Sequence, residues 1–69
     1  MKELALAYLR NKALSDRDKA LMSMTLLTEK AVGIGDHSTG DFHKNLDEAL
    51  DTLVDAEDRI EILGKYYGK

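Results

Sequence analysis

The 69-residue sequence contains no cysteine, no proline and no tryptophan. Without cysteine the chain has no disulfide, no thiol nucleophile and no cysteine ligand for zinc or an iron–sulfur cluster. Catalysis would therefore depend on carboxylates, histidine, hydroxyl groups or a bound metal ion.

Long apolar runs are also missing. The longest run near the start covers only residues 4–9. This is too short for a signal-peptide core or for a membrane span, which needs about 20 residues. We therefore expect a cytoplasmic protein that has no membrane partner.

The size of the chain limits its stability as a monomer. Residues 1–69 are enough for one domain, and folding at this size removes only about 60% of the accessible area of the unfolded chain. The sequence is 43% hydrophobic and 33% charged, which is typical of a globular protein. We expect a single helical domain with a marginal core.

The charge differs between the two halves of the chain. Residues 1–32 carry six basic and four acidic side chains, and residues 33–69 carry four basic and nine acidic ones. Binding to phosphate backbones needs a concentrated basic face, whereas the second half of this chain is acidic. The sequence therefore argues against a nucleic acid as partner.

Glycine divides the chain at one place. Gly33, Gly35 and Gly40 fall within a predicted loop, residues 33–41, and good helix formers lie on both sides of it. No stretch alternates apolar and polar residues as a strand would. The sequence predicts an all-α fold: an antiparallel helical hairpin or a small three-helix unit.

The second half has the clearer helical pattern, predicted as a helix over residues 42–66. Apolar residues follow one another at alternating spacings of three and four, which is the heptad pattern of a coiled coil or helix bundle. The pattern consists of Leu46, Ala49, Leu53, Ala56, Ile60, Leu63 and Tyr67. Gly64 and Gly68 predict fraying around Tyr66 and Tyr67.

The first half supplies matching small residues, Ala13 and Ala20, which predict close packing of two helices. Residues 15–19 are polar through more than one turn, and Ser15 followed by Asp18 resembles a capping box. We therefore expect two helices here, over residues 2–12 and 16–32.

Several apolar residues remain outside a two-helix contact. They are Leu21, Met22, Leu26, Val32, Leu50, Val54 and Ile62. A homodimer that forms a four- or six-helix bundle would bury them. Self-association into such a bundle is therefore predicted.

The loop holds the one concentration of reactive side chains. Asp36, His37, Asp41 and His43 lie within eight residues, and His37, Asp41 and His43 are candidate metal ligands. Their spacing matches no metal motif, so turn and cap roles are the favoured interpretation. We assign no cofactor and no catalytic residue.

The same loop also has features of an anion site. Gly33 and Gly35 free backbone N–H groups, Ser38 and Thr39 add hydroxyls, and a helix N-terminus follows. Because Asp36 and Asp41 would repel a phosphate, an anion site in this loop is an alternative and not the leading prediction. A further alternative is a magnesium-dependent hydrolase that uses acidic pairs on the second helix, such as Glu48 with Asp51 and Asp55 with Asp58.

Two segments carry a resemblance: Val-Gly-Ile-Gly-Asp-His-Ser over residues 32–38 and Asp-Arg-Ile-Glu-Ile-Leu over residues 58–63. Together with the acidic heptad helix, they resemble small uncharacterised proteins encoded by tailed phages. The resemblance implies no activity and no functional residue. It favours a cytoplasmic accessory protein that acts through protein contacts.

The sequence thus predicts a small helical interaction or regulatory protein that is not an enzyme. Its expected partners are a second copy of itself and an unidentified protein. The candidate binding residues are Gly33, Gly35, Asp36, His37, Ser38 and Thr39. The alternative is a metal- or phosphate-binding protein that uses the loop, with hydrolysis as one form of that alternative.

Overall fold

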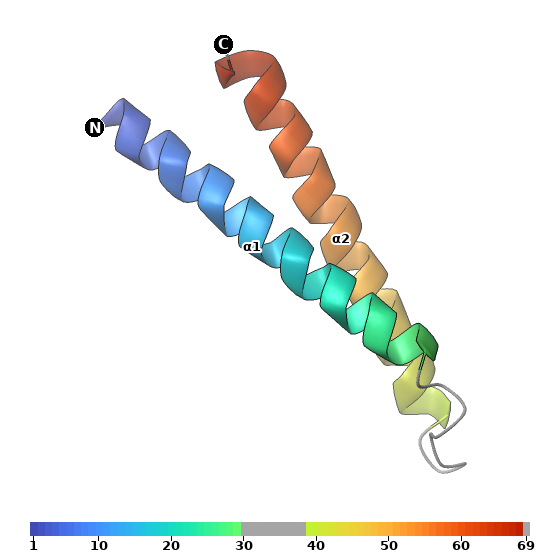
Figure 1. Cartoon of the computed structure of the whole chain (residues 1–69). Coiled ribbons are helices and arrows are strands. Elements are labelled where there is room, and N and C mark those ends of the chain that lie inside the picture. The colour runs from blue at the N-terminus through green and yellow to red at the C-terminus, as the bar shows by residue number, and fades with distance from the viewer. Residues whose placement is uncertain (30–38, 69) are drawn as a thin grey trace.

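The computed structural model describes residues 1–29 and 39–68 and shows two antiparallel helices. Helix α1 spans Lys2–Glu29 and helix α2 spans Thr39–Tyr67, and they pack against each other along their length. Both chain ends lie at the same end of the hairpin (Figure 1). The described part of the chain contains no strand, so the predicted all-α hairpin is confirmed.

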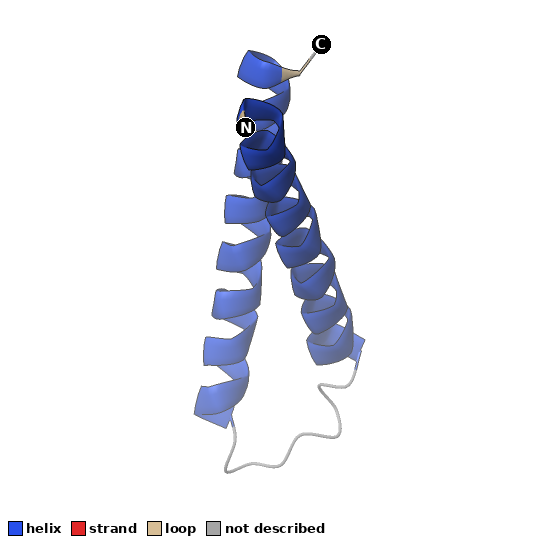
Figure 2. Cartoon of the chain, turned by 90° about the vertical axis from the view of Figure 1, so that its left-hand side faces the viewer, coloured by secondary structure: helices blue, strands red, loops and turns tan. Residues whose placement is uncertain are grey.

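The hairpin is elongated rather than compact. Its Cα atoms extend over 50 × 16 × 15 Å, with a radius of gyration of 15.5 Å. A compact chain of this length would have a radius of gyration of about 11 Å. The helices diverge toward the termini in Figure 1 and toward Glu29 and Thr39 in Figure 2, so their axes cross at an angle.

The predicted division of the first half into helices 2–12 and 16–32 is wrong, because α1 runs without a break through Ser15. Lys12 and Asp16 span the expected break with an ion pair of 2.9 Å between Nζ and Oδ2. Ala13 and Ala20 are buried on either side of the polar turn. The polar turn therefore needs no large apolar residue of its own to stay packed against α2.

The boundaries of α2 also differ from the prediction. The helix begins at Thr39 rather than at residue 42, so the last three residues of the predicted 33–41 loop are helical. Asp41 then lies in the first turn, where a carboxylate interacts favourably with the helix dipole. At the other end α2 continues through Gly64 to Tyr67, so the expected fraying around Tyr66 and Tyr67 is not seen. The remainder of the predicted loop and the expected end of the first helix lie outside the described residues.

The core is narrow and consists mainly of alanine. Its buried members are spaced by seven along each helix: Ala13, Ala20, Ala49, Ala56 and Leu63. The predicted heptad residues Leu46, Leu53 and Ile60 are only half-buried. The small residues let the two helices approach closely, but they remove little apolar area from water.

Candidate protein-interaction surfaces

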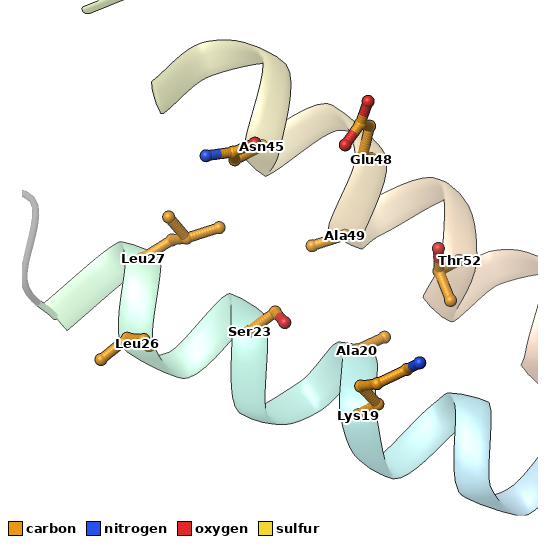
Figure 3. A pocket seen from close by; sticks show the side chains of 9 residues that line it. All are labelled: Lys19, Ala20, Ser23, Leu26, Leu27, Asn45, Glu48, Ala49 and Thr52. Carbon is orange, nitrogen blue, oxygen red and sulfur yellow. The ribbon is translucent and has the colours of Figure 1, made fainter. Parts of the chain in front are cut away.

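One side of the hairpin carries a groove between the helices whose lining mixes polar and apolar side chains (Figure 3). We call this side the polar face and its groove the polar groove, because charged and amide side chains lie along it. The groove has a volume of about 360 Å³. It is lined by Lys19, Ala20, Ser23, Leu26, Leu27, Asn45, Glu48, Ala49 and Thr52. Ala20 of α1 and Ala49 of α2 project into the same gap, which places these two residues at one level of the hairpin.

Charged side chains continue the polar face toward the termini. Lys12 donates a hydrogen bond to Asp16, and Arg59 donates one to Asp55, each at 2.9 Å. The hydrogen bond from Lys12 lowers the pKa of Asp16, and the charges of Lys12, Lys19 and, to the smallest extent, Arg59 on the other helix lower it further. The same hydrogen bond raises the pKa of Lys12. Arg59 therefore lies across the helix contact from Lys12 and Asp16.

The opposite side of the hairpin is apolar. The polar groove is lined by residues that follow a buried alanine by three positions: Ser23 follows Ala20, and Thr52 follows Ala49. At 100° per residue, the residues directly after a buried alanine lie on the other side of the contact. We call this side the apolar face, and it consists of Leu14, Leu21, Met24, Leu46, Leu50, Leu53 and Ile60.

The apolar face is only partly covered within one hairpin. Leu21 is 45% exposed and Leu50 is 48% exposed, and the other members are half-buried. Three charged residues share this face: Arg10 and Glu57 lie toward the terminal end, and Arg17 lies near the middle of α1. Arg17 donates a hydrogen bond to Asp18 through Nη2 at 3.2 Å.

The predicted set of leftover apolar residues divides between several sides. Leu21, Met22, Leu26, Leu50, Val54 and Ile62 are all exposed, as expected, and Val32 lies outside the described residues. Leu21 and Leu50 belong to the apolar face. Met22 lies on the outer side of α1, and Leu26 and Ile62 lie on the side of the polar face. A single interface would therefore not cover them all.

A smaller groove lies near the termini on the side of the polar face. Leu9, Asp58, Arg59, Ile62 and Leu63 line it, and its volume is about 230 Å³. Leu9 from α1 meets α2 here, while Ile62 is half exposed. We call this site the terminal groove. Its lining combines apolar side chains with the charges of Asp58 and Arg59.

Most of the predicted loop residues fall outside the part of the chain that the structure describes. Gly33, Gly35, Asp36, His37 and Ser38 lie outside the described residues. Thr39 is the first residue of α2.

Asp41 and His43 are exposed in the first turns of α2. They are two positions apart, so their side chains point in different directions. The His43 ring lies beside that of Phe42, with centroids 5.8 Å apart. In residues 1–29 and 39–68, no three histidine, aspartate or glutamate side chains are grouped as a metal site. The metal and anion interpretations of the loop stay predictions.

The acidic pairs considered for a magnesium site are exposed along α2. Glu48 and Asp51 are open to solvent, and so are Asp55 and Asp58. Asp55 accepts the hydrogen bond from Arg59, and Glu48 lines the polar groove. In the hairpin these carboxylates form a solvated surface.

The sequence analysis did not identify the polar face or the terminal groove. A signal for the polar face was present, because Asn45, Thr52 and Arg59 repeat every seven residues in α2. Neither helix has a stretch long and apolar enough to cross a membrane, within the part of the chain that the structure describes. Comparison with protein-family models, curated proteins and solved structures found no match to this chain.

Proposed function

We propose that this chain is a non-enzymatic helical interaction protein that forms a homodimer through the apolar face. Two hairpins packed in this way make a four-helix bundle. The bundle would then bind a different protein through surfaces that dimerisation leaves open.

The observation that carries the proposal is the large accessible surface of one hairpin. The chain exposes 5506 Å², whereas a compact monomer of its 7.7 kDa mass would expose about 4,300 Å². The excess is about 1,200 Å² per chain. A standard protein interface covers about 800 Å² per partner, and permanent dimers cover more. One dimer interface would account for the excess.

The composition of the core supports the same conclusion. Among the residues that the structure describes, four of the five buried ones are alanines, and Leu63 is the one large buried side chain. Leu21 and Leu50 are about half exposed, so covering each would add about 1 kcal/mol of stabilisation. A second copy supplies an apolar surface of matching extent, because a two-fold interface brings the same face together twice.

Sedimentation equilibrium tests the dimer directly. We expect the mass of two chains at micromolar concentration, and a melting temperature that rises with protein concentration, because association stabilises the folded state by mass action. A monomer that melts cooperatively at a temperature independent of concentration would refute the proposal.

Two matched variants locate the interface. Leu50→Glu places a carboxylate in the apolar face and should abolish the dimer together with most of its helicity. Met22→Glu makes a similar change on the outer side of α1, where the native side chain is 67% exposed, and should leave the dimer intact. Equal effects of the two substitutions would show that the apolar face is not the interface.

The terminal groove is the site we propose for the different protein. It lies away from the apolar face, so it remains open in the bundle. Ile62→Glu should leave the dimer unchanged and abolish chemical crosslinking to proteins that the wild-type dimer and the Met22→Glu control both capture. Capture that persists in Ile62→Glu would refute this assignment.

A further inference from the structure

We infer that the second copy docks in one orientation, with the termini of both hairpins at the same end of the bundle. This inference rests on the proposed dimer and adds its geometry. In this arrangement the two-fold axis runs along the bundle, and α1 of each copy packs against α2 of the other.

The register inside one hairpin fixes which residues of the two helices lie level with each other. Ala20 and Ala49 lie at one level, so Ala13 is level with Ala56, because each lies seven residues further along an antiparallel pair. The same register places Leu9 near Ile62 and Leu63, which share the terminal groove with it.

This register sets which residues of the apolar face share a level. Met24 lies near the level of Leu46, and Leu21 lies near that of Leu50. Closer to the termini, Arg10 lies near the level of Glu57. Toward Glu29 the apolar face therefore carries leucine and methionine on both helices. Toward the termini the opposite charges of Arg10 and Glu57 lie among the apolar residues Leu14 and Ile60.

When the termini lie at the same end, each level of one hairpin meets the same level of the second copy. Leu21 then packs against Leu50 of the second copy, and Met24 packs against Leu46 of the second copy. Arg10 meets Glu57 of the second copy. Leu21 and Met24 thus gain apolar neighbours, and Arg10 and Glu57 gain an opposite charge, while Arg17 lies near the level of Leu53.

The reversed orientation gives a poor match. With the helices overlapping along their full length, Arg10 would face Leu21 of the second copy, and Glu57 would lie level with Leu50, while Arg17 would lie level with a leucine in either orientation. Charges buried against leucine without partners are strongly unfavourable. Sliding the hairpins apart would relieve this clash only by shortening the overlap and returning apolar surface to water.

The orientation of the two hairpins can be tested by reversing single charges and then mixing the two variants. In Arg10→Glu, two glutamates would face each other across the interface, and in Glu57→Arg, two arginines would do so. Each variant alone should dimerise at least about tenfold more weakly than wild type. In a mixture of the two, both interchain pairs regain opposite charge, while residues 10 and 57 within each chain stay alike.

Native mass spectrometry of mass-tagged chains measures the fraction of mixed dimers. We expect mixed dimers to dominate, with an affinity close to that of wild type, whereas random pairing would give one half mixed dimers. Lys44→Glu, a charge reversal on the exposed outer side of α2, is the control and should pair at random with wild type. Random pairing in the Arg10→Glu and Glu57→Arg mixture would overturn the inference.

A distance measurement provides a second test, because the chain has no native cysteine to interfere with labelling. Spin labels on Lys2→Cys should lie within about 25 Å of each other, the width of two helices. The reversed dimer would separate them by about 40 Å along the axis. The longer distance would overturn the orientation and leave the dimer standing, whereas a monomeric wild type would overturn both.

Discussion

The alanine contact between α1 and α2 makes a sharp prediction for Ala56→Leu. Ala56 is 1% exposed, and the register places it level with Ala13, which is also 1% exposed. A leucine here adds three carbon atoms at a point where neither helix has room for them. The helices would have to separate, since contacts between small residues allow axes about 8 Å apart, while larger side chains need about 10 Å.

The cost of this separation follows from the way the core is built. Overpacking a buried site typically costs about 1–3 kcal/mol. Separation at Ala56 would also loosen the neighbouring Ala20 and Ala49 contact, so we expect a value of about 2 kcal/mol per chain. For a domain of this size, that corresponds to a fall in melting temperature of roughly 8–16 °C.

Thermal unfolding followed by circular dichroism, at one fixed protein concentration, measures the effect. Ala5→Leu is the matched control, because the same side chain is added at an exposed position of α1. That variant should melt within a few degrees of wild type. If Ala56→Leu melts at or above the wild-type temperature, the close alanine contact does not exist in solution.

Two further predictions concern single residues. Gly64→Ala should raise the melting temperature by roughly 4–8 °C, because no atom lies within 4 Å of the added Cβ and alanine favours a helix interior by about 1 kcal/mol. Gly68→Ala should give no gain, because its Cβ would lie 2.5 Å from the Gly64 carbonyl oxygen, and an equal gain from both would contradict the geometry of the α2 end. The lowered pKa of Asp16 should stabilise the fold above its ordinary pKa of 3.8, with the contribution lost as pH falls through the lowered value. The melting temperature of Lys12→Gln should therefore be slightly below that of wild type at pH 7 and equal to it at pH 2. NMR titration of this variant should show the Asp16 pKa returning toward 3.8. An unchanged pKa would show that the Lys12 hydrogen bond is absent.

The hairpin and its contact residues were predictable because the repeat in the second half is regular. Apolar residues from Leu46 to Leu63 recur at spacings that only a helix can gather on one side. Ala13, Ala20, Ala49 and Ala56 were identified as a close-packed contact, and all four are buried.

The break predicted near Ser15 shows where local reasoning failed. A polar turn without an apolar residue is a sound local signal for a helix boundary. It was outweighed by packing against α2, because Ala13 and Ala20 on either side are buried. That packing joins residues that lie far apart in the sequence, so no local pattern could reveal it.

The two faces of the hairpin were also only partly predictable from the sequence. The sequence showed that apolar residues were left over, but it did not show which of them share a side. That depends on the register between the helices, which puts Ser23 and Thr52 in one groove and Leu21 and Leu50 on the opposite face.

The sequence by itself determined that this chain is helical, that its two halves pack against each other, and that small residues form the contact. These properties follow from helix propensity and from a periodicity carried by each helix alone. Only the tertiary structure decided that α1 is continuous, how little the hairpin buries, and that one side is polar while the other is apolar. Each of these depends on how two helices are set against each other, a relation that is not contained in the pattern of either one.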